Sequence, residues 1–235
     1  MTAWLPDWLG PAEKEALLLS LKVAFWATLV SLPFGIAAAH ALARGRFWGR
    51  ALLDGLIQAP LILPPVVTGF LLLLAFGRNG PAGAFLENTF GLTVAFRWTG
   101  AALAAAVMAF PLMVRAMRLS LEAADPRLEE AAATLGAPPL ARFVLVTLPL
   151  MAPGILAGAV LAFAKAMGEF GATIAFVASI PGETRTVPAA IYALLQTPGG
   201  EPAALRLAAL SLCVALAALV ASESLARAAA RRIAS

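Results

Sequence analysis

The chain has few of the residues that build disulfides, metal sites or charged surfaces. Its 235 residues include one cysteine and one histidine, and charged residues make up 13% of the sequence. Cys213 therefore has no partner for an internal disulfide, and His40 with one distant cysteine is too little for a metal site of about four ligands. Soluble domains carry about 25% charged residues. The shortage of charge indicates that most of this chain is not surrounded by water.

Hydrophobic residues make up 61% of the sequence, and the mean hydropathy is +0.88. They gather in five long runs, at residues 16–43, 51–76, 98–118, 144–168 and 203–226. About 20 such residues cross a hydrocarbon layer of about 30 Å, and each span must be helical because lipid offers no hydrogen-bond partners. We predict an all-α, polytopic membrane protein with five strong spans in a transmembrane domain of residues 16–235.

Two further segments carry weaker signals. Residues 1–15 contain Trp4 and Trp8 about one helical turn apart, so we expect this segment to lie flat at the membrane interface. Residues 184–196 are moderately apolar but too short to span the bilayer. They form either a short re-entrant helix that enters from the outer side or a sixth membrane helix.

Basic residues are unevenly distributed along the chain. Five would lie outside if the chain starts outside: Lys14, Arg78, Arg97, Arg185 and Arg206. Ten would then lie inside: Arg44, Arg46, Arg50, Arg115, Arg118, Arg127, Arg142, Arg227, Arg231 and Arg232. Because cytoplasmic loops carry the excess of Lys and Arg, we expect the N-terminus outside and the C-terminus in the cytoplasm. Membrane orientation thus explains the net charge of +4 without a nucleic-acid partner.

The most specific pattern lies between the third and fourth runs. Glu130, Ala131 and Ala132 are followed after three residues by Gly136, and after nine more by Val-Thr-Leu-Pro at residues 146–149. The helix-forming residues that precede Gly136, and the two prolines that follow it, predict a short helix that stops at this glycine in a left-handed turn. Such an elbow gives another protein a rigid contact.

This segment resembles the EAA loop of permease subunits of binding-protein-dependent ABC importers. The resemblance implies that residues 122–143 form a coupling loop whose short helix docks on a separate ATPase subunit. Glu130, Ala131, Ala132 and Gly136 would make that contact. ABC importers use ATP and Mg²⁺ bound by the ATPase, so the permease itself needs no cofactor. In agreement, the sequence has no phosphate-binding loop of the form G-x-x-x-x-G-K-[ST], and we expect no enzymatic activity of its own.

A second segment begins with Gly-Glu-Phe-Gly-Ala-Thr-Ile at residues 168–174 and continues to Glu201. It is similar to molybdate permeases and more distantly to sulfate permeases. The resemblance implies a type I ABC importer permease fold and a homodimer with two ATP-binding subunits in a bacterial cytoplasmic (inner) membrane. A periplasmic or extracellular molybdate-binding protein would deliver the oxyanion, which crosses by alternating access. Molybdate and tungstate remain alternatives because their sizes and charges are nearly equal, and sulfate or thiosulfate is a further alternative.

Several polar or flexible residues inside the runs are candidates for the translocation path. Thr68 and Thr173 place hydroxyl groups in apolar spans, and Gly168 and Gly171 loosen the backbone next to Thr173. Neutral donors suit an anion that must bind and leave again. The alternative is a kinked helix that uses small residues for packing.

Lys165 and Glu169 are four residues apart and therefore lie on one helical face. Charges inside a span either pair with each other or face an aqueous path. This spacing fits an ion pair without a transport role. It fits equally an element of the path or gate. In the outer loops, Arg78 and Arg185 are candidates for docking the delivery protein, and a solvated arginine is the alternative.

Two other classes of membrane protein fit the composition. A secondary transporter driven by an ion gradient would carry inverted repeats and paired intramembrane acids, and neither is visible. A channel or a structural scaffold would have no need of the EAA pattern. An experiment that shows whether anion uptake requires an ATPase subunit would distinguish the importer from both of these classes.

Overall fold

A computed structural model shows an all-helical chain, in agreement with the prediction. It describes the backbone of residues 9–234 and the side chains of residues 9–220 and Ser224. Within this range there are eleven α-helices, one π-helix and no strand. Four helical stretches are long and apolar enough to cross a membrane: Pro11–Arg44 (α1), Trp98–Ala123 (α5), Pro139–Met167, and Glu201–Val220 in α11 (Glu201–Ala234).

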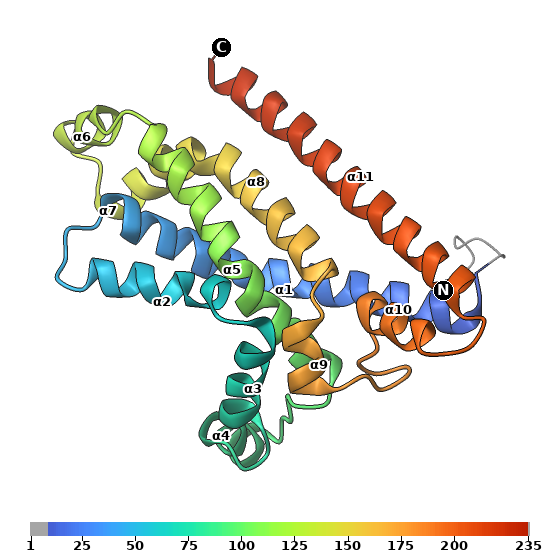
Figure 1. Cartoon of the computed structure of the whole chain (residues 1–235). Helices are drawn as coiled ribbons and strands as arrows, with labels where there is room; N and C mark the ends of the chain where they lie inside the picture. Colours follow the sequence, from blue (N-terminus) through green and yellow to red (C-terminus); the bar gives the residue numbers. More distant parts are fainter. Residues whose placement is uncertain (1–8, 235) are drawn as a thin grey trace.

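The centre of the bundle is α5. It packs mainly against α1 and against α8 (Leu148–Met167), and Figure 1 shows it running through the middle of the chain. Within its most apolar stretch 61% is buried inside the chain, compared with 11% for α11. The helix α5 therefore forms the core, whereas residues 201–220 of α11 leave most of their apolar surface exposed.

Two glycines allow α8 to approach α5 closely. Gly154 and Gly158 are one turn apart on the face of α8 that meets α5. A Cβ atom on Gly158 would lie 2.8 Å from the carbonyl oxygen of Met113, and one on Gly154 would clash with the side chain of Ser120. Small residues at this spacing are typical of helix contacts in membranes, where packing replaces the hydrophobic effect.

The apolar run at residues 51–76 is not one straight span. It forms Arg50–Ile62 (α2) and Pro65–Phe76 (α3), which are bent by 115°. A residue before proline avoids the helical region, and both Leu63 and Pro64 precede a proline. Their ψ angles of 143° and 133° are accordingly extended. Counted as one span, this bent pair would bring the number of candidate spans to five by length and composition; as a re-entrant loop it would leave four.

A second interruption follows α8. The chain continues as Gly171–Val177 (α9) and Val187–Leu195 (α10) before α11 begins. The nine residues of α10 agree with the short helix predicted for residues 184–196 and are too few to span a bilayer. The first N–H of α10, on Val187, donates a buried hydrogen bond of 2.7 Å to Ser20 Oγ of α1.

The remaining short segments lie at the ends of the bundle. They are Pro81–Phe90 (α4), Arg127–Thr134 (α6), Pro139–Arg142 (α7) and the π-helix Phe143–Thr147 (η1). In Figure 1, α6 and α7 lie at the end opposite to α10 and the start of α1. The predicted interfacial segment falls largely on residues 1–8, outside the described part, and α1 already begins at Pro11.

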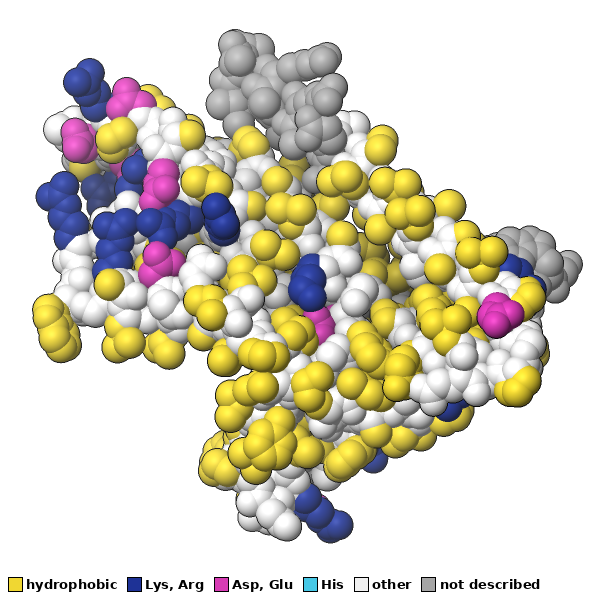
Figure 2. Space-filling view, viewed as in Figure 1, with side chains coloured by type: hydrophobic (Ala, Val, Ile, Leu, Met, Phe, Trp, Pro, Cys, Tyr) yellow, Lys and Arg dark blue, Asp and Glu magenta, His cyan; other side chains and the backbone are white. Residues whose placement is uncertain are grey.

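Charged side chains gather at the end that carries α6 and α7, whereas hydrophobic ones are spread over the rest of the face shown in Figure 2. At this end Arg118 of α5 lies 2.9 Å from Asp54 of α2 and 2.7 Å from Glu122. At the other end Arg206 of α11 lies 3.0 Å from Glu13 of α1. Ion pairs between different helices therefore close the bundle at both ends.

Replacing Gly154 with alanine is expected to destabilise the α5–α8 contact. The added methyl group overpacks the contact, which costs about 1–3 kcal/mol. Gly55→Ala is the matched control because a Cβ atom there meets nothing within 4 Å, and alanine gains up to about 1 kcal/mol in helix propensity. Thermal unfolding of the detergent-solubilised chain measures both. Equal unfolding temperatures for the two variants would contradict the close contact.

Candidate functional site

The helix α6 stands apart from the bundle and has no buried residue. Glu130 and Ala131 are exposed, and Ala132 is half-buried. Two acidic residues, Glu129 and Glu130, lie in its first turn, where they interact favourably with the positive end of the helix dipole. The carboxylate of Asp125 accepts a hydrogen bond of 2.9 Å from the N–H of Arg127 at the helix start. An exposed helix with two alanines on it presents a smooth surface to a partner.

Gly136 ends α6 in the predicted left-handed turn. Its φ angle is +84°, a conformation that glycine adopts without strain. The N–H of Gly136 donates to Ala133 O at 3.0 Å, and the N–H of Ala137 donates to Ala132 O at 3.1 Å. This pair of bonds is the Schellman motif, which satisfies the last carbonyls of a helix. The turn thus fixes the direction in which the chain leaves α6.

On its inner side α6 is attached to the bundle through Glu129. One carboxylate oxygen, Oε2, lies 3.3 Å from Arg44 Nε on α1, and the other accepts a hydrogen bond of 3.0 Å from the Thr147 hydroxyl on η1. The EAA pattern predicts a contact role for Glu130 and gives no reason to predict a role for its neighbour Glu129, although both are acidic. A cleft of about 510 Å³ lies here, lined among others by Glu129, Glu130, Arg44, His40 and Arg142.

The two breaks in the helical stretches, one between α2 and α3 and one between α8 and α9, lie next to each other in the structure. A Cβ atom on Gly171, at the start of α9, would lie 2.7 Å from Pro65 Cβ at the start of α3. A Cβ atom on Gly69 of α3 would lie 2.8 Å from the Cβ of Ala175 in α9. The breaks before α3 and before α9 are therefore side by side, although they are about one hundred residues apart in the sequence. Interrupted membrane helices of this kind mark the binding sites of many transporters.

Lys165 and Glu169 form an ion pair at the second break. Lys165 Nζ lies 2.6 Å from Glu169 Oε2, and Glu169 Oε1 accepts a hydrogen bond of 3.0 Å from the N–H of Ala172 in α9. The Glu169 side chain is 2% exposed, whereas that of Lys165 is 31% exposed. Glu169 therefore connects the end of α8 to the start of α9, and the Lys165 ammonium group neutralises its charge there.

The two predicted path hydroxyls differ in their surroundings. The Thr173 hydroxyl donates to backbone carbonyls that precede it, at 2.9 Å from Phe170 O and 3.3 Å from Glu169 O. Thr68 is also buried, but its hydroxyl has no hydrogen-bond partner among the described residues. Of these two hydroxyls, that of Thr68 therefore has a free O–H donor. Thr68 lies on α3, one turn after the break between α2 and α3.

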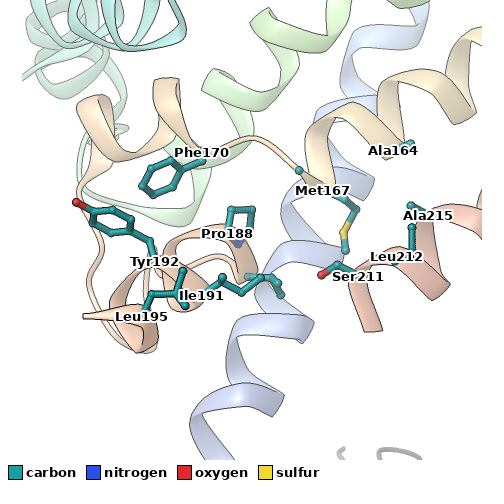
Figure 3. A pocket seen from close by; sticks show the side chains of 12 residues that line it. Ala164, Met167, Phe170, Pro188, Ile191, Tyr192, Leu195, Ser211, Leu212 and Ala215 are labelled. Atoms are coloured by element: carbon teal, nitrogen blue, oxygen red, sulfur yellow. The ribbon is translucent and has the colours of Figure 1, made fainter. Parts of the chain in front are cut away.

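A groove of about 560 Å³ lies beside Gly168, between the end of α8, α10 and α11. Figure 3 shows the side chains that line it, with the Phe170 and Tyr192 rings close together at one end; their centroids are 5.2 Å apart. Of the twelve lining residues, Tyr192 and Ser211 carry hydroxyl groups and the others have no polar side chain. Because its lining is mostly apolar, this groove fits an apolar group such as a lipid chain better than an oxyanion.

The two outer arginines are placed differently. Arg78 lies in the loop before α4, where its side chain is 82% exposed and its Nη2 is 3.3 Å from Glu87. Arg185 is half-buried, and its Nε donates to Ser179 Oγ at 3.2 Å. Within the described residues, no group of three or more His, Cys, Asp or Glu side chains is placed to hold a metal ion.

Comparison with curated proteins gives relatives along almost the whole chain. It is 57% identical over 222 residues to the molybdenum transport system permease protein ModB of Escherichia coli (strain K12), covering 94% of each chain. It is 53% identical over 215 residues to ModB of Haemophilus influenzae, covering 92% of this chain and 94% of that one. The identity to the sulfate transport system permease protein CysT of Salmonella typhimurium is 37% over 226 residues, covering 95% and 81%.

Two solved structures share the fold at low sequence identity. One is a bacterial ABC transporter involved in the import of the acidic polysaccharide alginate, with a TM-score of 0.71, 17% identity and coverage of 96% of this chain and 86% of that one. The other is an amino acid ABC transporter with histidines, with a TM-score of 0.61, 16% identity and coverage of 92% and 94%. The family described as binding-protein-dependent transport system inner membrane component matches residues 31–234. The chain therefore belongs to this family of inner-membrane transport components.

Proposed function

We propose that the chain is the permease subunit of an ABC importer that carries molybdate across the bacterial cytoplasmic membrane. The observation that carries this proposal is 57% identity to a molybdenum transport permease over 94% of both chains. The 37% identity to a sulfate transport permease supports molybdate over sulfate. Tungstate has nearly the same size and charge, so the path would accept it too, and the binding protein would make the choice.

The helix α6 would dock on the ATPase subunit. Support comes from its exposure, from the small side chains of Ala131 and Ala132, and from the rigid turn at Gly136. Glu130 adds an exposed charge for a basic partner group. The sequence has no phosphate-binding loop, so the ATPase would hold ATP and Mg²⁺ and this chain would not be an enzyme.

Two copies of the chain would form a homodimer that offers one α6 to each of two ATPase subunits, with closed twofold symmetry. The gathering of Lys and Arg at the α6 and α7 end supports a cytoplasmic location for that end. The start of α1 would then lie outside and the end of α11 inside. Arg78, the more exposed of the two outer arginines, would contact the molybdate-binding protein, with Arg185 as a second candidate.

The path would run past the two adjacent helix breaks. Thr68 offers a hydroxyl without a partner, and Gly168 and Gly171 flank the segment that joins α8 to α9. Lys165 and Glu169 would act as a gate, because a neutral pair lets the anion pass without trapping it. Thr173 would hold the start of α9 through its bonds to the backbone. Alternating access requires that each ligand prefers one of two states.

Uptake into proteoliposomes tests the function as a whole. With the ATPase subunit, the molybdate-binding protein and ATP present, we expect molybdate to accumulate, and sulfate not to accumulate under the same conditions. Omission of the ATPase subunit should abolish uptake. Persistent uptake without that subunit would instead favour a transporter driven by an ion gradient, or a channel.

Replacement of Gly136 by proline is expected to abolish association with the ATPase subunit. Proline has a φ angle near −65°, which is incompatible with the +84° observed at this turn. Gly199→Pro is the matched control, since Gly199 has a φ angle of +78° in the turn before α11, far from α6. Co-purification of the ATPase subunit should be lost in the first variant and kept in the second. Retention in both would refute docking through this turn.

Glu169→Gln is expected to impair transport and to lower stability. The substitution leaves Lys165 without its partner in an apolar setting, which costs about 1–3 kcal/mol given that Lys165 keeps some exposure. Glu87→Gln is the control for stability, because its partner Arg78 is exposed and such pairs contribute about 0–1 kcal/mol. Thermal unfolding is measured for both variants, and ATP-driven uptake for Glu169→Gln. Full uptake by the folded Glu169→Gln variant would exclude a gating role.

A further inference from the structure

We propose that Glu129 is the positioning residue that transmits movement of α6 to the membrane helices, whereas Glu130 beside it faces the partner. This inference rests on the proposed function, because it concerns how work done on α6 reaches the path. It assigns different tasks to two neighbouring acids. The two tasks are separable by experiment because they involve different contacts.

An attachment of this kind is needed because α6 has little else to hold it. Its eight residues are too few for a helix that is stable by itself, since helices shorter than about 12 residues are marginal in water. None of its residues is buried. The segment before it, residues 124–126, has no helical structure. On this side a push on α6 would be absorbed in the connecting segment unless side chains join α6 directly to the bundle.

Glu129 makes the connection with both of its carboxylate oxygens. Oε2 lies 3.3 Å from Arg44 Nε at the end of α1, which is an ion pair by distance without hydrogen-bond geometry. Oε1 accepts a hydrogen bond of 3.0 Å from the Thr147 hydroxyl in η1, which continues into α8. The side chains of Arg44 and Glu129 are 20% and 16% exposed, so the pair is partly shielded from water. Electrostatic attraction is stronger in such surroundings than on an open surface.

Arg44 extends the connection to a third helix. Its Nη2 donates a hydrogen bond of 3.2 Å to the carbonyl oxygen of Ala124, which caps the end of α5. The Glu129 carboxylate and the Arg44 guanidinium group therefore join α6 to the ends of α1 and α5, and to η1, which continues into α8. These are the helices whose mutual packing forms the core of the chain.

The positions of Glu129 and Glu130 on α6 explain their different surroundings. Consecutive residues of an α-helix point about 100° apart. Glu129 is therefore turned toward Arg44 and Thr147, while Glu130 is exposed. Thr147 is buried at the last position of η1, and π-helical segments are frequently found at functional sites. Glu130 also lines the cleft beside Glu129, but among the described residues no ion pair or hydrogen bond joins its side chain to the bundle. The same short helix thus has one acid bonded to its own chain and one that is left for a partner.

Two variants with equal loss of charge, Glu129→Gln and Glu130→Gln, distinguish the tasks. Hydrogen exchange of residues 127–135 is measured first, on the permease without any partner. We expect exchange to rise roughly tenfold in Glu129→Gln, because the attachment of α6 is weakened, and to stay at the wild-type rate in Glu130→Gln. This readout does not depend on transport. Equal exchange in the two variants would overturn the assignment of Glu129 as the attachment.

The second measurement is the number of molybdate ions transported per ATP hydrolysed in proteoliposomes that contain the complete complex. We expect this ratio to fall by roughly tenfold in Glu129→Gln, with normal co-purification of the ATPase subunit. Glu130→Gln should instead weaken co-purification. A wild-type ratio in Glu129→Gln would refute transmission through this residue. Absence of molybdate uptake in the wild type would refute the proposed function, and the exchange measurement would still stand.

Additional variants test whether the three side chains act together. If Arg44 and Glu129 form one unit, the double variant Arg44→Gln/Glu129→Gln should show no lower ratio than the worse single variant. Thr147→Val removes the hydroxyl with little change of shape and should lower the ratio less than Glu129→Gln does. Independent, multiplicative losses from Arg44→Gln and Glu129→Gln would contradict a shared role.

Discussion

A polar backbone group in hydrocarbon must find its partner within the protein, and this constraint governs where the helices of this chain are interrupted. One interruption lies at Pro64 and Pro65, and prolines have no N–H to satisfy. The other lies at residues 168–170, where the Glu169 carboxylate accepts the N–H of Ala172. Both interruptions are packed against each other through Gly69 and Gly171. The chain thus concentrates its irregular backbone in one protected place.

Around this place the bundle combines continuous and interrupted helices. The helices α5 and α8 meet through a glycine contact in which a single added methyl group would clash. By contrast, α2 and α3 are joined through extended residues, and α9 follows α8 after a short link beside the Lys165–Glu169 ion pair. At the α6 end, Arg44 of α1 pairs with Glu129 of α6, and Arg118 of α5 pairs with Asp54 of α2.

Local patterns in the sequence were sufficient for much of this architecture. The apolar runs indicated the spans, Gly136 with its prolines indicated the turn, and the spacing of Lys165 and Glu169 indicated their common face. A kinked helix around Thr68 was one of the alternatives, but the sequence did not indicate a bend as large as 115°. The contacts of Glu129 were also missed. Arg44 lies more than eighty residues before it in the chain, and no local pattern reports a pairing over that distance.

The two acids of α6 have a consequence for how such transporters diversify. The inward acid is constrained by side chains of the same polypeptide, so any replacement there requires compensating changes at Arg44 or Thr147. Among the described residues, the side chains of Glu130 and Ala131 are exposed and make no such bonds. If α6 docks as we propose, a lineage could adapt to a different motor by altering the outer face of one short helix, while the internal linkage is inherited intact.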